Sequence, residues 1–192
     1  LQFSNVLMPS VGATGFDQVM LIDGNDDRGI DVGIMARNGY QVGWIRSHVD
    51  DVDDRAGRIF SRDCPEYSIW TPSGAVVWVL VNHFKSKGYG SKDSSDARRW
   101  RQAEEVRRIY ERLKSEGAKY ICVVGDLNDT PESEPLSPLI RSSDLKDISE
   151  HPSFMADGHT GTFQNGTERD KIDYILLSPA LYARVQQGGY WR

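Results

Sequence analysis

The sequence predicts a mixed α/β (α+β) fold, a strand-rich domain that one long helix interrupts. Short runs of β-branched and aromatic residues alternate with clusters of Gly, Pro, Asn and Asp, a pattern typical of a strand-rich domain. A single long segment has helical periodicity, and it lies between two continuous apolar runs. The length of 192 residues fits one domain over residues 1–192.

The strands are expected on both sides of the helix. Before it, the sequence predicts strands at residues 18–22, 30–36, 40–45 and 67–70. The turn Thr71-Pro72-Ser73-Gly74 then leads into residues 75–81, whose continuous apolar character predicts a central strand buried on both faces. A last strand is expected at residues 172–177, after a looped stretch rich in Pro and Ser.

Residues 95–116 are expected to form a helix that buries one stripe. Ser94 or Ser95 is expected to cap its start, and Gly117 to close it. The next apolar run, residues 120–124, completes a strand–helix–strand crossover, so the two flanking strands should be parallel. The stripe consists of apolar residues at spacings of three and four: Ala97, Trp100, Ala103, Val106, Tyr110 and Leu113.

Composition and charge restrict the classes of function. The net charge of −5 argues against a general electrostatic attraction to nucleic acid, which depends on Lys and Arg. No apolar run approaches the roughly 20 residues of a membrane span, so membrane insertion is not expected. The two cysteines imply no disulfide framework, and Cys122, inside an apolar run, is expected to be a buried thiol.

Polar side chains follow both central strands. Asn82 and His83 end the first, and residues 125–129 (Gly-Asp-Leu-Asn-Asp) follow the second. Function gathers beyond the carboxyl ends of parallel strands, and Asp173 reaches the same edge if the last strand is antiparallel. We therefore expect four candidate catalytic residues to converge there: His83, Asp126, Asn128 and Asp173.

These residue types suit hydrolysis of a phosphodiester. Mg²⁺ prefers oxygen ligands, which Asp126 and the amide oxygen of Asn128 can supply beside a substrate phosphate. His83 can act as general acid or donate a hydrogen bond to the phosphate, with Asp173 orienting its ring. Taken singly, each residue also has a structural interpretation: the Asp126-Leu127-Asn128 segment as a turn, His83 as a structural strand-end residue, and Asp173 as a capping acid.

The motifs resemble the endonuclease/exonuclease/phosphatase superfamily, which includes pancreatic-type DNases, apurinic endonucleases, inositol-phosphate phosphatases and neutral sphingomyelinases. Residues 81–87 (VNHFKSK) are similar to the family strand that ends in a catalytic His. Residues 125–128 match its G-D-x-N motif, and residues 170–175 (DKIDYI) match its R/K-I-D-Y-I segment.

This resemblance implies a DNase I-like sandwich of two β-sheets flanked by helices. It implies His83 and Asp173 as a partnered pair, and Asp126 and Asn128 at the phosphate and the metal, which would be Mg²⁺ or Mn²⁺, with Ca²⁺ as a third candidate. The residues around His83, at 82–87, and the upstream residues 60–63 are most similar to those of bacterial extracellular nucleases, which slightly favours a secreted protein. The candidate phosphate-binding residues are Arg28, Arg62, Asn82, Lys85 and Lys87; for Arg62, a solvated Arg at a strand start is an equal alternative.

Two parts of the family pattern have no counterpart in the sequence. The family carries a metal-binding Glu on an early strand and a terminal S-D-H motif, whereas His151 and His159 precede the last strand and lie in loops. We therefore expect a domain that is incomplete at both ends, binds metal weakly and has little activity.

A nuclease is the favoured function, acting on DNA or RNA as its nucleic-acid partner. Basic residues accumulate after His83 at Lys85, Lys87, Lys92, Arg98, Arg99 and Arg101. The three arginines can equally form the solvated face of the helix. Two alternatives stay open: a phosphatase or phosphodiesterase of a small phosphate ester or lipid head group, and a non-catalytic binding module.

Overall fold

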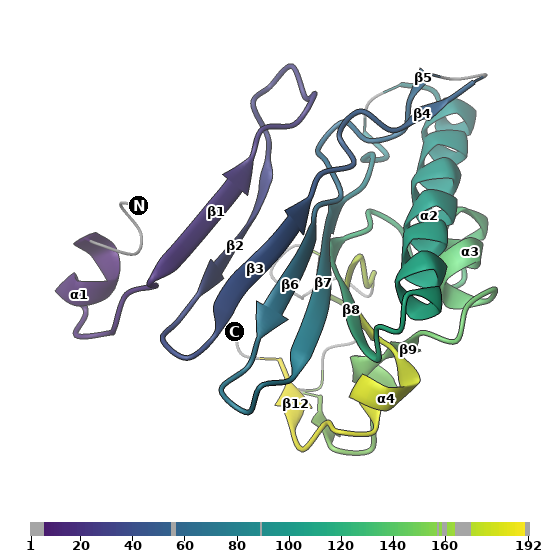
Figure 1. The fold of residues 1–192 in the computed structure, drawn as a ribbon. Helices are drawn as coiled ribbons and strands as arrows, with labels where there is room; N and C mark the ends of the chain where they lie inside the picture. Colours follow the sequence, from purple (N-terminus) through teal and green to yellow (C-terminus); the bar gives the residue numbers. More distant parts are fainter. Residues whose placement is uncertain are drawn as a thin grey trace.

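The protein has a six-stranded sheet at its centre. The computed structural model describes residues 6–54, 57–88, 90–156, 158, 161–163 and 170–190. The strands of the main sheet are β3 (Gln41–Arg46), β6 (Glu66–Trp70), β7 (Val76–His83), β8 (Tyr120–Asp126), β9 (Lys146–Asp147) and β11 (Asp173–Leu177). Their order across the sheet is β3-β6-β7-β8-β11-β9 (Figure 1). The mixed α/β class predicted from the sequence is confirmed.

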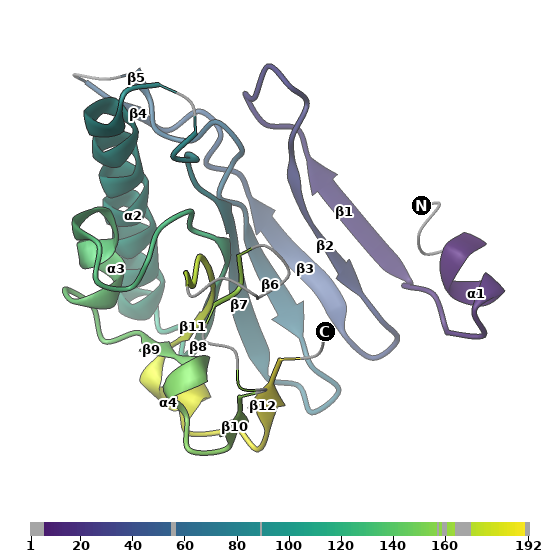
Figure 2. The same cartoon turned by 180° about the vertical axis from the view of Figure 1, so that it is seen from behind.

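A second, two-stranded sheet is formed by the antiparallel hairpin of β1 (Gln18–Ile22) and β2 (Val32–Ala36). The helices α2 (Lys92–Ser115) and α3 (Ser137–Ile140) cover one face of the main sheet, and the hairpin lies on the side away from them (Figures 1 and 2). Because β2 contacts β7, the two sheets form adjacent layers, as the sandwich expectation requires.

The remaining elements are short. They are α1 (Met8–Ser10), α4 (Pro179–Tyr182), the 3₁₀ turns η2 (Glu134–Leu136) and η3 (Ile148–Glu150), and the strands β4 (Val52–Asp53), β5 (Gly57–Arg58), β10 (Phe154–Met155) and β12 (Gly188–Gly189). Several of them lie in the stretch expected to be looped, where Pro and Ser allow single turns but no long helix. None of the helices in the described part of the chain is long and apolar enough to cross a membrane.

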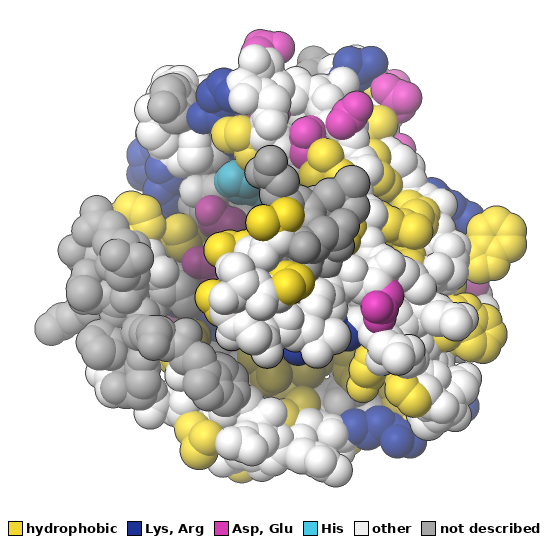
Figure 3. All heavy atoms as spheres, turned by 90° about the vertical axis from the view of Figure 1, so that its left-hand side faces the viewer, with side chains coloured by type: hydrophobic (Ala, Val, Ile, Leu, Met, Phe, Trp, Pro, Cys, Tyr) yellow, Lys and Arg dark blue, Asp and Glu magenta, His cyan; other side chains and the backbone are white. Residues whose placement is uncertain are grey.

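The main core lies between α2 and the sheet. Alternate strand residues point to it, including Leu80 on β7, Val123 on β8 and Tyr174 on β11, and all three are almost fully buried. From α2, residues such as Val106 and Leu113 complete the cluster. Since side chains alternate between faces along a strand, the intervening residues, His83 among them, point to the opposite face. On the side of the molecule seen in Figure 3, a histidine lies in a recess beside acidic side chains.

The crossover follows the sequence prediction. The strand β7 pairs with β8 in parallel, with α2 between them in the chain, and β11 pairs with β8 antiparallel. The cap differs: Ser91, not Ser94 or Ser95, accepts a hydrogen bond from the Ser94 N–H at the start of α2. Cys122 and Cys64 are free and buried, as expected for Cys122.

The buried stripe of α2 differs from the prediction in its first turns. Ala97 is exposed, and Trp100 is 43% exposed. Arg99 and Gln102 are buried in their place. These turns pack on the polar segments that follow β7 and precede β6, not on the apolar sheet: Gln102 accepts a hydrogen bond from Lys85 N and donates one to the carbonyl of Ile59. An apolar periodicity therefore identifies the inner face only where the partner surface is apolar.

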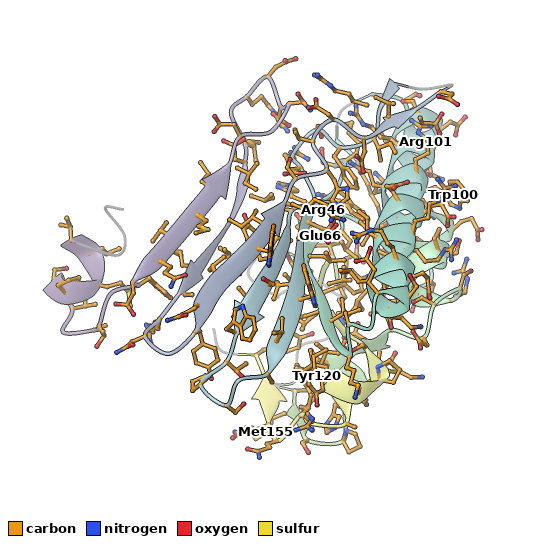
Figure 4. The ribbon with its side chains drawn as sticks, in the orientation of Figure 1. Arg46, Glu66, Trp100, Arg101, Tyr120 and Met155 are labelled. Atoms are coloured by element: carbon orange, nitrogen blue, oxygen red, sulfur yellow. The ribbon has the colours of Figure 1, made fainter. Side chains whose placement is uncertain are left out.

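A buried ionic cluster joins β3, β6 and α2. Glu66, at the start of β6, is 1% exposed and accepts a hydrogen bond from Arg112 on α2. His48 places Nε2 2.5 Å from Glu66 Oε1 and Nδ1 2.6 Å from Asp51 Oδ2. Arg46 lies 4.0 Å from the same Glu66 oxygen (Figure 4). Burial of the imidazole lowers the pKa of His48, but the hydrogen bonds to Glu66 and Asp51 outweigh burial and raise it overall.

This cluster predicts a pH-dependent stability. The folded-state pKa of His48 is raised above its unfolded value, so the contribution to stability is complete below about pH 6.5. It is lost as the pH rises through the folded-state pKa. We expect the free energy of unfolding from urea titrations to fall as the pH rises above about 6.5, and the His48→Gln variant to lack this slope. A slope that is unchanged in His48→Gln would show that other groups set the pH dependence.

Candidate active site

Three titratable side chains form one row at an edge of the sheet. The parallel pairing of β7 and β8 places His83 opposite Asp126, and the antiparallel pairing of β8 and β11 places Asp126 opposite Asp173. Paired residues of adjacent strands share a face, so all three point away from α2. Strands lie about 4.8 Å apart, so the row spans roughly 10 Å. The structure thus brings together three of the four residues expected at this edge, and the fourth, Asn128, follows directly.

Gly125 makes this pairing sterically feasible. Its φ of +129° lies in a region that L side chains rarely adopt, and a Cβ built on it would lie 1.8 Å from the carbonyl oxygen of Asn82. The glycine of the G-D-L-N segment is therefore required where β7 and β8 approach each other, one residue before Asp126.

The segment after β8 is a turn that also positions the site. Asp126 Oδ1 accepts a hydrogen bond from Asn128 N at 2.8 Å, and Asn128 adopts a left-handed φ of 54°, which asparagine tolerates. The Nδ2 group of Asn128 donates to the carbonyl of Phe84 at 3.1 Å. The structural interpretation of this segment as a turn is correct. The turn also ties Asn128 to the residue that follows His83.

Burial dominates the electrostatics of the row. It raises the pKa of Asp126 to about 6; Asp173 adds to this, whereas the Asn128 N–H and Arg62 oppose it. Burial, with the charge of Arg62, lowers the pKa of His83. His83 Nε2 lies 3.8 Å from Asp126 Oδ2, which is too far for a hydrogen bond. At neutral pH the imidazole is therefore uncharged, and Asp126 carries a poorly compensated charge.

The direct pair of His83 and Asp173 is not formed. The strand β8 lies between β7 and β11, so the acid next to His83 is Asp126. Asp173 acts on the imidazole only as a weak, more distant charge that raises the pKa of His83. Sequence order alone could not give this arrangement, because it depends on which strands are neighbours.

Three of the candidate phosphate-binding residues line one open pocket of about 310 Å³: Arg28, Arg62 and Lys85. Arg62 is 3% exposed, so the alternative of a solvated arginine is wrong for this residue. Its Nη1 donates to the carbonyl of Phe84 at 2.9 Å, and its Nε lies 3.0 Å from Asp26 Oδ2. Arg28 binds Asp26 through two hydrogen bonds of 3.0 and 3.1 Å.

The other two candidates lie elsewhere. Lys87 pairs with Asp129 at 2.7 Å and lines a neighbouring pocket. Asn82 is 3% exposed and donates to the carbonyl of Leu80, so it does not face a substrate in this structure. The reason is the pleat: as the neighbour of His83 on the same strand, Asn82 points to the α2 face.

The oxygen ligands available at the row suit Mg²⁺. The Nδ2 group of Asn128 donates to the carbonyl of Phe84, so Asn128 can offer a cation only its amide oxygen. This oxygen adjoins the desolvated carboxylate of Asp126. Within the described ranges, no group of three His, Cys, Asp or Glu side chains could hold a metal ion. Mg²⁺ is commonly bound by one or two carboxylates, with water and substrate phosphate completing its coordination shell. Asp126 and Asn128 therefore suit Mg²⁺ better than a metal ion that requires all its ligands from the protein.

Sequence reasoning missed the buried role of Arg99, which supports the site. Arg99 is fully buried, and its Nε donates to Asp129 at 2.9 Å while its Nη1 donates to the carbonyl of Lys85 at 3.0 Å. It also pairs with Asp96. The interpretation of Arg99 as part of a solvated face is therefore wrong. The sequence does indicate that Arg99 is buried, through the helical spacing of the polar residues Ser95, Arg99 and Gln102. A search for apolar periodicity does not detect this pattern.

Comparison with sequence families gives one match over most of the chain. The model of the Endonuclease/Exonuclease/phosphatase family matches residues 11–188. Comparison with curated proteins gives no match.

Solved structures share the fold at low sequence identity. The mannosyl-6-phosphatase of Bacteroides thetaiotaomicron VPI-5482 has a TM-score of 0.64 and 17% identity, covering 85% of this chain and 64% of that chain. The human Nocturnin catalytic domain with bound sulfate has a TM-score of 0.63 and 14% identity, covering 93% and 66%. Sphingomyelinase C from Streptomyces griseocarneus has a TM-score of 0.58 and 15% identity, covering 86% and 63%. This chain thus spans just under two thirds of each of these proteins.

The buried arginine predicts a large loss of stability on substitution. We expect Arg99→Leu to lower the free energy of unfolding in urea by about 3–5 kcal/mol, because it removes a buried cation that the buried Asp129 and the partly exposed Asp96 share. The control is Arg108→Leu on the same helix, whose side chain is 65% exposed and whose loss should cost less than about 1 kcal/mol. Equal losses in the two variants would contradict the structural role of Arg99.

Proposed function

This chain belongs to the endonuclease/exonuclease/phosphatase family, and on that premise we propose that it is a divalent-metal-dependent phosphodiester hydrolase, specifically a nuclease. The observation that carries the proposal is the row of His83, Asp126 and Asp173 at one sheet edge, next to a pocket lined by arginines. A nucleophile activator, oxygen ligands for a cation and groups that bind a phosphate are then within one surface region.

Asp126 and Asn128 are the residues that would hold Mg²⁺ or Mn²⁺. When bound, the ion polarises the phosphoryl oxygen and stabilises the leaving oxygen. The raised pKa of Asp126 supports this assignment, because a carboxylate that lacks a compensating charge gains most from a cation. Asp173, the next acid in the row, adds negative potential to the same position.

His83 is suited to accept a proton. Its lowered pKa keeps the imidazole neutral at pH 7, so Nε2 or Nδ1 can take the proton of an attacking water while the other nitrogen donates a hydrogen bond. Arg62, held against the carbonyl of Phe84, keeps the proton affinity of His83 low in the absence of substrate.

The first prediction concerns cleavage of DNA. We expect only slow nicking of supercoiled plasmid with Mg²⁺ or Mn²⁺, because the early metal-binding Glu and the S-D-H motif of the family have no counterpart in this sequence. EDTA should abolish this nicking, and His83→Ala should reduce it about 10²- to 10⁴-fold, the usual range for loss of a general acid or base. Gel densitometry over time gives the rates. The matched control is His151→Ala, since His151 stacks on Tyr182 outside the row and its loss should leave the rate unchanged.

The same series on p-nitrophenyl phosphate and bis-p-nitrophenyl phosphate separates the substrate classes. Cleavage of the monoester without plasmid nicking, sensitive to His83→Ala, would replace the nuclease by a phosphatase. No cleavage of any of the three esters would leave a binding module as the function. Nicking that persists at full rate in His83→Ala would contradict the role of the histidine.

The second prediction concerns metal binding without catalysis. Millimolar Mg²⁺ should raise the melting temperature of the wild type by about 2–4 °C for each kcal/mol that Mg²⁺ binding adds to the free energy of unfolding, and it should not raise that of Asp126→Asn. Without metal, Asp126→Asn should melt no lower than the wild type above pH 6, because the wild-type carboxylate is ionised there at the expense of folding. An equal response to Mg²⁺ in both proteins would remove Asp126 from the metal site.

A further inference from the structure

The pocket beside the catalytic row is formed by four separate segments of the chain. It opens between the β1–β2 connection, the segment before β6, the segment after β7 and the second turn of α2. Four cations line it, Arg28, Arg62, Lys85 and Arg98, together with the acids Asp26 and Asp27. Neither His83, Asp126 nor Asp173 lines it, so a group bound there lies next to the reacting atoms and not among them.

The acid in this pocket is already shared by two arginines. Asp26 accepts two hydrogen bonds from Arg28 and lies 3.0 Å from Arg62 Nε. The hydrogen bond from Arg28 is the largest cause that lowers the pKa of Asp26 to about 2. Asp26 thus orients both guanidinium groups in the absence of ligand.

Arg98 forms no ion pair with an acid in the described part of the chain, although the charge of Asp26, in the same pocket, partly compensates its guanidinium. Its Nε is buried without a hydrogen-bond partner there, and its Nη2 makes only a long contact of 3.5 Å to the carbonyl of Arg58. Burial lowers the pKa of Arg98, and the charge of Arg101 lowers it further. A half-buried guanidinium without an ion pair is costly, and an anion in the pocket that Arg98 lines would compensate its charge.

The pocket and the catalytic row share one backbone group. The carbonyl of Phe84 accepts hydrogen bonds from Arg62, in the pocket wall, and from Asn128, next to Asp126. A substrate that binds both in the pocket and at the catalytic row therefore needs two anionic groups a short distance apart. Figure 3 shows Lys and Arg side chains close to the recess that holds the histidine and the acids.

We propose that this pocket binds a second phosphate group of the substrate, with Arg98 as its specific ligand, while the scissile phosphate lies at the row of His83, Asp126 and Asp173. This inference rests on the proposed function and narrows its substrate class to compounds with two neighbouring phosphates. The second phosphate has two sources: the adjacent linkage of a nucleic-acid strand, or the other phosphate of a small bisphosphate.

The test compares binding by wild type, Arg98→Gln, Arg98→Lys and the control Arg108→Gln, in the presence of Mg²⁺. Arg108 lies on the same helix, is 65% exposed and pairs with Glu104 and Glu105, so its substitution removes the same charge at a distance from the pocket. The probes are a labelled single-stranded thymidine oligonucleotide with phosphorothioate linkages that resist hydrolysis, glycerol 1,2-bisphosphate as the small bisphosphate, and glucose 6-phosphate, measured by anisotropy and by competition.

We expect Arg98→Gln to weaken binding of a two-phosphate probe about fivefold or more, Arg98→Lys to retain most of the affinity, and Arg108→Gln to change nothing. For the oligonucleotide, Arg98→Gln should also reduce the salt slope by about 0.7, the value for one phosphate of a single strand. Loss confined to the oligonucleotide identifies a nucleic-acid strand as the source, and loss confined to the bisphosphate identifies a small molecule. Binding of glucose 6-phosphate should be unchanged in every variant.

Two results would overturn the inference. If Arg98→Gln binds both two-phosphate probes with wild-type affinity, Arg98 does not contact the bound phosphate. If Arg98→Gln loses as much affinity for glucose 6-phosphate as for the two-phosphate probes, the pocket binds a single phosphate and not a second one. Hydrolysis is scored separately by the plasmid and nitrophenyl ester assays. If wild type cleaves an ester but Arg98→Gln binds normally, the inference fails and the proposed function stands. If Arg98→Gln binds as expected but no ester is cleaved, the proposed function fails and the phosphate pocket stands.

Discussion

The pairing of β7 with β8, and of β8 with β11, is the constraint on which the site depends. One residue of slip in either ladder would move His83, Asp126 or Asp173 to the α2 face, because side chains alternate along a strand. Apolar residues at alternate positions, such as Leu80, Val123 and Leu176, hold the register by packing against α2. The core on one face therefore fixes the chemistry on the other. Gly125 is the point where this pairing needs a particular residue, since any side chain there would collide with Asn82 O.

The first turns of α2 secure the segments that carry the site, by polar contacts. Arg99 joins Asp129, after β8, to the carbonyl of Lys85, after β7, and Gln102 accepts from the N–H of Lys85. A buried ionic network is seldom the most stable solution for a helix interface, since apolar packing of equal volume is often as stable or more so. What it provides here is directional contact with the backbone of Lys85, after β7, and with the carboxylate of Asp129, after β8. Apolar side chains could fill the same space but could not orient those two segments.

Much of the fold was predictable from the sequence, because it depends on local pattern. The long strands, the helix and its parallel crossover follow from apolar runs and periodicity, and the row of His83, Asp126 and Asp173 follows from where those strands end. The neighbour order of β7, β8 and β11 was not predictable from the sequence, so the sequence could not show that Asp126 lies between His83 and Asp173. The buried role of Arg99 was also missed, because it depends on the polar surface that α2 meets.

Arg62 couples the phosphate pocket to the proton affinity of His83. Its guanidinium lowers the pKa of His83 and opposes the burial that raises the pKa of Asp126, while Asp26 balances part of its charge. Under the proposed function, an incoming phosphate would neutralise Arg62 further. The proton affinity of His83 would then rise at the moment when a proton acceptor is needed. The net charge of −5 does not oppose this, since buried and half-buried groups act over a few ångströms and the distant acids are screened by salt. Local geometry, and not the total charge, therefore decides whether this surface attracts a phosphate.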